Sequence, residues 1–222
     1  MTDMNELAAE IVRASSNAPL RLRQGVISTV NSDGTANVTV AGSSTVLTSI
    51  AVASHVCPVP GTTVFLATDG RDWFIISSLS PAGNAWGAMR QSVAQSVATG
   101  TWTAMSWANR TDTAARGVTL GSAGLTCVVP GLYQITGAAA FPSNATGQRH
   151  MVLTVNATNV IHGTGGNAAA GGDISRLRAD GLYRLSVGDV VNFELFQTST
   201  VSLNTQVGAG YGMLRMVWIS PA

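Results

Sequence analysis

The alternation of apolar and polar side chains in LYRLSVGDVVNFELFQ, residues 182–197, is the feature of the sequence that most constrains its fold. Every second residue is apolar from Tyr183 to Val187 and again from Val191 to Leu195. A period of two indicates β-strands rather than a helix. Between the two runs, Gly188 can adopt the positive φ of a tight turn, and the Asp189 carboxylate can accept a hydrogen bond from a backbone N–H of that turn. The segment therefore predicts a β-hairpin.

The composition indicates a large apolar interior and few charges. Hydrophobic residues make up 45% of the 222 residues, enough for the core of one large or two small domains. Charged residues make up only 10%, against roughly 25% in ordinary soluble domains. We attribute the low charge to surface that subunit contacts cover. No apolar run approaches the ~20 residues of a membrane span, so no membrane insertion is expected.

The distribution of charge argues against binding to nucleic acid and against secretion through a signal peptide. The net charge is +1 and all twelve basic residues are Arg, which gives no bulk attraction to nucleic acid. Asp3, Glu6 and Glu10 occupy the region that is basic in a secretory signal peptide. No signal peptide is therefore expected.

Residues 1–18 are expected to form a docking helix. Asp3 followed by Glu6 fits a capping box over residues 3–16. The apolar stripe of this helix consists of Met4, Leu7, Ala8, Ile11 and Val12. Because so short a helix is marginal alone, we expect Met4, Leu7 and Ile11 to dock it against its own copies or a larger assembly.

Residues 19–80 predict a small barrel. Turn-rich breaks separate five strand candidates: Gly25–Val30, Thr35–Val40, Thr45–Ala53, Thr63–Thr68 and Trp73–Ser78. Five strands in about sixty residues favour a barrel of the oligonucleotide/oligosaccharide-binding (OB) type. The Val-x-Val-x-Gly, Pro-Gly-x-x-Val and Trp-x-Ile-x-Ser series resembles the small barrels inserted in phage tail and baseplate proteins.

An OB-like barrel can also bind single-stranded nucleic acid through stacked aromatic rings and basic side chains. The candidates for such a groove are Phe65, Trp73, Phe74, Arg21, Arg23 and Arg71. We expect Phe65 and Trp73 in the core instead, and three arginines are too few for a groove. No nucleic-acid partner is expected.

The C-terminal region, residues 92–222, is expected to follow a Pro/Gly/Ala linker at residues 81–91. Its Trp-Thr-Ala, Pro-Gly-x-Tyr, Thr-Gly-x-Arg and Gly-Asp-x-Val series, in this order, resembles the trimeric jelly roll of the tumour necrosis factor family and of the globular heads of complement, of which phages and bacteria carry many versions. The extended Gly/Ala segment from Gly163 to Gly172 departs from that pattern, and we expect it to form a loop at the tip. The resemblance and the barrel together predict an all-β fold with a short N-terminal helix, an OB-like barrel and a trimeric jelly-roll sandwich.

The last strand is apolar on both faces, since Met213, Val217 and Ile219 share one parity and Leu214, Met216 and Trp218 the other. A sandwich covers one face of each sheet, so a neighbouring subunit is expected to cover the second. The resemblance places this strand and those near Tyr133 and Tyr183 on an inner sheet around a threefold axis, with Asn192 and Glu194 toward water. The expected contacts of the homotrimer are Tyr133, Tyr183, Leu214, Met216 and Trp218.

The sequence contains no recognisable catalytic or metal motif. The three histidines are isolated, and a carboxylate pair has only five acids of the C-terminal region to draw on, for which turn and surface roles are expected. Asp173 and Asp180 offer too few oxygen ligands for calcium. No cofactor, metal or enzymatic activity is expected, and Cys57 and Cys127 are interpreted as small buried hydrophobes.

These observations favour a virion protein of a tailed phage, with the helix contacting other virion proteins and the jelly-roll head binding a host-surface glycan. The alternative is a capsid decoration or head-fibre protein with a structural role only. Sugars are held by amide, hydroxyl and guanidinium groups, and loops on a rigid sandwich are the usual place for recognition. The receptor-binding candidates are Asn144, Arg149, Asn167 and Arg176.

Overall fold

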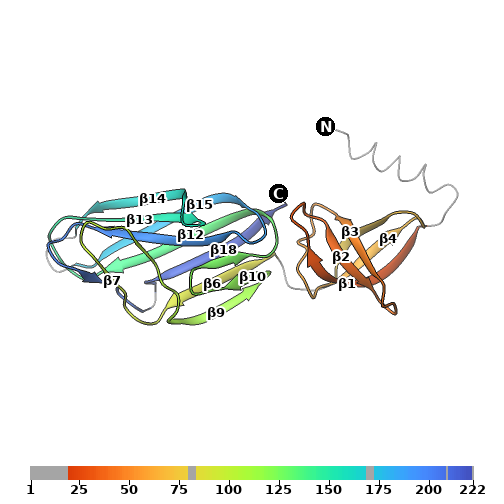
Figure 1. The fold of residues 1–222 in the computed structure, drawn as a ribbon, viewed down its shortest axis with the longest axis horizontal. Helices are drawn as coiled ribbons and strands as arrows, with labels where there is room; N and C mark the ends of the chain where they lie inside the picture. Colours follow the sequence, from red (N-terminus) through yellow and green to blue (C-terminus); the bar gives the residue numbers. More distant parts are fainter. Residues whose placement is uncertain (1–19, 80–83, 169–172, 209, 222) are drawn as a thin grey trace, which may run out of the picture. The chain divides into compact units, whose positions relative to one another are not determined.

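The structure, a computed structural model, describes residues 20–79, 84–168, 173–208 and 210–221, and the chain divides into two units, Met1–Gly83 and Asn84–Ala222. The described residues form strands, turns and bends (Figure 1). The expected docking helix, with Met4, Leu7 and Ile11, lies outside the described residues. Within these residues, no helical segment has the length and apolar character needed to cross a bilayer.

The first unit is a closed barrel of five strands, as the sequence predicts. Its strands are β1 (Arg21–Val30), β2 (Ala36–Val40), β3 (Val46–Val52), β4 (Thr63–Thr68) and β5 (Trp73–Ser78). They close in the order β1-β2-β3-β5-β4, with β4 returning to β1. The β3–β5 pair is parallel and the other pairs are antiparallel, so the barrel is not a simple meander.

Aliphatic side chains fill the barrel. Ile27, Val38, Val64, Leu66 and Ile75 are each at most 1% exposed. Trp73 packs against this core, as expected. Phe65 does not, because it lies on the outward parity of β4 and is half-buried, and Phe74 is 48% exposed. Turns close the strands through backbone N–H bonds to a carboxylate, as at Asp69, whose Oδ1 accepts hydrogen bonds from the backbone nitrogens of residues 71 and 72 at 2.8 and 2.9 Å. These bonds stabilise the ionised form and lower the pKa of Asp69.

The second unit, called here the head, is a sandwich of two main sheets. One is a five-stranded sheet in the order β15-β12-β18-β6-β9, and the other is six-stranded in the order β10-β11-β16-β13-β14, with β8 also paired to β16 (Figure 1). The strands of the first sheet are β6 (Trp86–Gln91), β9 (Arg110–Arg116), β12 (Gly131–Phe141), β15 (Ser175–Leu185) and β18 (Met213–Ser220). Those of the second are β8 (Thr103–Ala104), β10 (Val118–Leu120), β11 (Leu125–Cys127), β13 (Gln148–Val155), β14 (Asn159–Asn167) and β16 (Val190–Gln197). A small separate pair consists of β7 (Ser96–Val97) and β17 (Leu203–Asn204).

The segment of residues 182–197 forms strand, turn and strand, but the predicted hairpin pairing is wrong. Gly188 has φ +93°, and the Asp189 carboxylate accepts a 2.7 Å hydrogen bond from the Ser186 N–H, as expected. However, β15 pairs with β12 in one sheet, while β16 pairs with β13, β11 and β8 in the other. The turn therefore carries the chain from one sheet to the other.

The boundary between the units also differs from the expectation. Residues Trp86–Gln91, assigned to the linker 81–91, form β6, which lies between β18 and β9 in the five-stranded sheet. Gly87 is buried there, and the Val118 side chain fills the space that a Cβ would need, at a distance of 2.7 Å. The second unit accordingly begins at Asn84 rather than at residue 92.

The last strand is apolar on both faces, as predicted. However, the parity that was expected to meet a subunit faces the core of the sandwich, and the other parity faces outward. Leu214, Met216 and Trp218 are at most 3% exposed and point into the sandwich, as does Tyr133, which is fully buried. These four side chains therefore belong to the core of one chain and not to a surface that meets another subunit. Tyr183 pairs with Tyr133 across β15 and β12 on the same inward side and is half-buried.

The outward face of the five-stranded sheet carries the other parity. Its exposed apolar side chains are Leu182 at 63%, Ile219 at 46% and Trp86 at 38%. Half-buried Leu132, Met213 and Val217 lie on the same face. This set is called the outward apolar face below.

Two further expectations concern single residues. Cys57 and Cys127 are buried thiols, as predicted. Asn192 does not point freely to water, because its Oδ1 accepts a 2.8 Å hydrogen bond from Nε1 of Trp107 and its Nδ2 donates a 2.9 Å bond to the carbonyl of Met105. Asn192 thus satisfies a fully buried indole.

Candidate binding site

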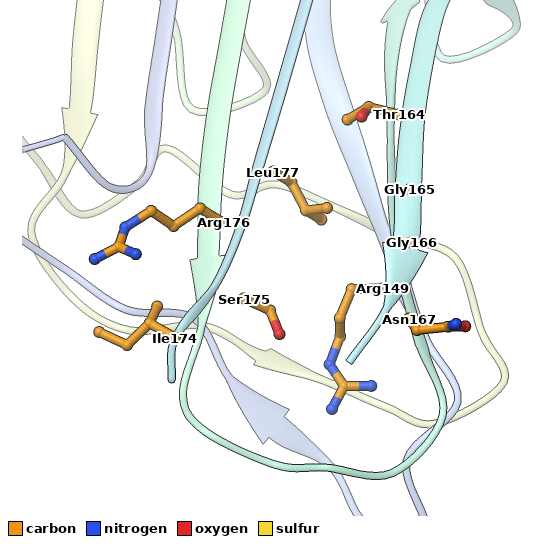
Figure 2. Close-up of a pocket in the computed structure, with 9 residues that line it drawn as sticks. All are labelled: Arg149, Thr164, Gly165, Gly166, Asn167, Ile174, Ser175, Arg176 and Leu177. Carbon is orange, nitrogen blue, oxygen red and sulfur yellow. The ribbon is translucent and has the colours of Figure 1, made fainter. Parts of the chain in front are cut away.

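A pocket of about 280 Å³ lies between the free edges of the two sheets, at the end of β14 and the beginning of β15. β14 is the last strand of the six-stranded sheet and β15 the last strand of the five-stranded sheet. The pocket is lined by Arg149, Thr164, Gly165, Gly166, Asn167, Ile174, Ser175, Arg176 and Leu177 (Figure 2). Three of the four receptor-binding candidates, Arg149, Asn167 and Arg176, are among these residues.

Part of the expected tip loop is a strand. Residues 163–167 belong to β14 and pair with β13, with Gly163 opposite Val152 and Gly165 opposite His150. The pocket wall is therefore ordered sheet rather than loop at these positions. The loop predicted over Gly163–Gly172 is shorter by five residues at its beginning.

Arg149 is the most buried of the candidates, with only 1% of its surface exposed. Its Nη1 donates hydrogen bonds to the carbonyls of Thr146 at 3.0 Å and Gln148 at 2.9 Å, and its Nη2 donates one to the carbonyl of Asn144 at 3.3 Å. The guanidinium carbon also lies 5.7 Å from the ring centre of Phe141, in range of a cation–π contact. Arg149 therefore holds the β12–β13 connection in place.

Burial of this guanidinium has an electrostatic consequence. No carboxylate pairs with Arg149 among the described residues, and its Nε is buried without a hydrogen-bond partner there. Burial disfavours the charged form and lowers the pKa of Arg149. The inner end of the pocket consequently has a positive potential.

Asn144 lies beside the pocket rather than on its wall. Its Oδ1 accepts a 2.9 Å hydrogen bond from the backbone N–H of Thr146, and its carbonyl accepts the bond from Arg149. The bond to Thr146 shapes the connection that Arg149 anchors. Asn144 thus contributes to the site by shaping its rim.

Arg176 and Asn167 are exposed and present their polar groups at opposite sides of the opening. Nη2 of Arg176 donates a 3.1 Å hydrogen bond to the hydroxyl of Tyr211, and its guanidinium lies 5.7 Å from the centre of that ring. Figure 2 shows the Arg176 guanidinium directed away from Arg149, and the Asn167 amide on the far side of the pocket. A ligand that reaches both groups must span the opening.

Sequence reasoning missed three residues of this region, because no sequence motif marks them as part of a site. Thr164 and Ser175 add hydroxyl groups to the wall, and Tyr211 positions Arg176. Ser175 pairs with Phe141 across β15 and β12, and Thr164 with Met151 across β14 and β13. Their placement depends on pairing between strands distant in sequence.

The pocket contains groups suited to binding and not an acid–base pair. The lining residues include two arginines, an amide and two hydroxyl side chains, but no Asp, Glu, His or Cys. Elsewhere in the described chain, no group of three His, Cys, Asp or Glu side chains is placed to hold a metal ion. Asp180 bonds instead to the guanidinium of Arg178 at 2.9 Å and to the hydroxyl of Thr136 at 2.6 Å, and these bonds lower its pKa.

Comparison with solved structures supports the expected fold of the head. A crystal structure of murine APRIL at pH 5.0 is similar to 62% of this chain over 100% of its own length, with 11% sequence identity and a TM-score of 0.50. A structure of Eiger TNF from S. frugiperda is similar to 63% of this chain over 96% of its length, with 11% identity and a TM-score of 0.48. No family model and no curated protein matches the sequence. The likeness to APRIL shows that the head has a jelly-roll fold of the tumour necrosis factor kind.

Proposed function

We propose that the protein is a non-enzymatic, homotrimeric virion protein of a tailed phage whose jelly-roll head binds a glycan on the host surface. The observation that supports this proposal is the pocket between β14 and β15, whose lining includes Arg149, Asn167 and Arg176. Guanidinium, amide and hydroxyl groups are the usual partners of sugar hydroxyls, and the site lies on a rigid sandwich. Its shallow, polar character fits a weak contact multiplied by three copies.

The outward apolar face supports the homotrimer. Leu182, Ile219 and Trp86 are large apolar side chains on one sheet face, where an isolated head leaves them in water. Exposed apolar surface of this kind marks contact sites. A jelly roll that packs this face against two copies of itself buries it around a threefold axis.

The remaining parts of the proposal concern assembly. Residues 1–18, through Met4, Leu7 and Ile11, attach the chain to other virion proteins, and the barrel acts as a spacer. The protein is then located in the virion after assembly in the host cytoplasm. The resemblance of the barrel sequence to those of phage tail and baseplate proteins supports this assignment.

Binding of the purified full-length protein to host cells tests the proposal. We expect saturable binding that falls at least tenfold when Asn167 and Arg176 are both replaced by Ala, because each trimer loses six polar contacts. Arg71→Ala is the matched control, since it removes the same charge from an exposed turn of the barrel. Circular dichroism and trimer mass are measured in parallel.

Two results would contradict the proposal in different ways. Wild-type protein that labels the particle but binds no host cell would instead favour the decoration or head-fibre role. Undiminished binding by the double variant would place the receptor surface outside the pocket.

A further inference from the structure

Three aromatic side chains form a row across the outer face of the six-stranded sheet. His150 on β13 is paired directly with Phe196 on β16. On the other side of β16, Leu195 pairs with Thr103 of β8, which places Trp102 next to Phe196. The row therefore runs His150, Phe196, Trp102 across neighbouring strands, and it is called the aromatic row below.

The rings are close enough to form one surface. The Trp102 and Phe196 centroids are 5.1 Å apart with their planes inclined by 34°, and those of His150 and Phe196 are 6.0 Å apart with an inclination of 57°. Trp102 is 45% exposed, and the other two rings are half-buried. Trp102 contacts Phe196 without being buried by it, so a broad indole face remains available to a ligand.

A glycine at the edge of the sheet extends this surface. Gly165 on β14 is paired with His150, and a Cβ at this position would lie 2.0 Å from Nδ1 of that ring. A larger side chain at this position would displace the imidazole. The imidazole therefore packs directly over the backbone of the edge strand at Gly165.

Polar groups that form hydrogen bonds flank the row. Glu194 lies two residues before Phe196 on the same face of β16 and is half-buried, and no described residue pairs with its carboxylate. On the other side, Nε2 of His150 lies 3.2 Å from Oε1 of Gln148, whose amide is exposed. A carboxylate and an amide on either side of these tilted rings can bond to hydroxyl groups of a ligand.

The charge of this face limits the class of ligand. The outward positions of β16 are Val190, Asn192, Glu194 and Phe196, and those at the start of β13 are Gln148, His150 and Val152. None is Arg, and the chain contains no Lys. A nucleic acid or an acidic polysaccharide needs cations where this face carries a carboxylate.

We propose that the aromatic row is a binding site for a neutral saccharide, whose apolar ring face stacks on Trp102 and Phe196 while its hydroxyls bond to Glu194 and Gln148. Sites for small polar ligands combine an aromatic platform with a few oriented polar groups, and this face has both. The inference deepens the proposed function, on which it rests for the presence of a glycan, because it names the class of sugar and adds a site outside the pocket.

Fluorescence titration and calorimetry of the full-length protein test the inference. The probes are neutral tetrasaccharides of glucose, galactose, mannose and N-acetylglucosamine, with tetragalacturonate as the acidic counterpart. We expect at least one neutral probe to change the tryptophan emission and to bind roughly tenfold more weakly to Trp102→Ala, which corresponds to about 1.4 kcal/mol. Glu194→Gln keeps the size of the side chain and is expected to weaken the same probe.

Val201→Ala is the matched control, because Val201 is an exposed apolar residue of this unit that lies outside the row. The inference is overturned if no neutral probe binds, if Trp102→Ala binds the probe as tightly as the wild type, or if tetragalacturonate binds best. Loss of binding in the Asn167 and Arg176 variants but not in Trp102→Ala would retain the proposed function and reject the aromatic row. Binding of a neutral probe to the row by a protein that binds no host cell would reject the proposed function alone.

Discussion

If the protein is the proposed homotrimer, replacing Leu182 with Arg is expected to dissociate it while leaving each head folded. Leu182 is 63% exposed on the outward apolar face, so the substitution leaves the single chain's core intact and changes its stability by about 0.5 kcal/mol or less. Full burial of a leucine side chain is worth about 1.5–3 kcal/mol. Burial of the exposed part in a trimer therefore contributes roughly 1–2 kcal/mol per copy, or about 3–6 kcal/mol for the assembly.

An unpaired guanidinium in the same contact adds a further penalty of a few kcal/mol per site. The association constant of the trimer is then expected to fall by at least about two orders of magnitude. Sedimentation velocity measures the change, and thermal unfolding shows whether the chain remains folded. Val201→Arg, also on an exposed apolar residue, is the control and should remain trimeric.

A wild type that sediments as a monomer, or a Leu182→Arg variant that remains trimeric at the lowest concentration measured, would show that the outward apolar face does not hold a trimer together. Leu214→Arg cannot replace it as a test. Leu214 is fully buried in the sandwich, so an arginine there would unfold the head whether or not it forms trimers.

Three further predictions concern stability. Gly147→Ala is expected to cost several kcal/mol in chemical denaturation, because φ is +77° and the Cβ would lie 2.3 Å from a backbone carbonyl oxygen, whereas Gly188→Ala, with φ +93° and open space around it, should cost only about 1–2 kcal/mol. The bonds from Arg178 lower the pKa of Asp180, so their contribution to stability is complete above the ordinary carboxyl pKa of 3.8 and is lost as pH falls below it. Asp180→Asn should therefore reduce the fall in thermal midpoint on acidification. Asn192→Ala leaves a buried indole N–H and a carbonyl unpaired, and is expected to cost about 1–3 kcal/mol per group by denaturant titration.

The strands of the barrel could be predicted from the sequence because turn residues enclose each of them. β4 and β5 have the predicted bounds, and Gly34, Gly42 and Gly70 adopt positive φ in the breaks. β1 begins at Arg21 rather than Gly25 because pairing with β4 extends to Arg21 opposite Thr68. That extension depends on a distant strand and leaves no local signal.

Pairing in the head could not be predicted from periodicity alone. The alternation around Gly188 and Asp189 shows two strands and a turn, but a turn that joins two sheets has the same local pattern as a hairpin. Similarly, the side chains on both faces of β18 are apolar, so the alternation does not indicate which face packs against the core. From the sequence we predict Trp218 and Leu214 on the outer face, whereas the structure buries both and exposes Ile219.

The candidate site was predicted in part. Arg149, Asn167 and Arg176 were recognised from their chemistry, and strand pairing places them at one pocket. The anchoring role of Arg149 depends on carbonyl groups of the β12–β13 connection, which the sequence does not show. The glycines of residues 163–166 indicate a loop, but Gly165 is a strand residue because β14 pairs with β13 there, opposite His150.

Binding of the protein to host cells before and after enzymatic removal of their surface polysaccharide tests whether the head binds a glycan. We expect saturable binding to untreated cells, which is lost after the treatment and restored when the polysaccharide regrows. Binding that is unchanged by the treatment, or no binding to untreated cells by a protein confirmed as trimeric, would contradict a glycan-binding role for the head.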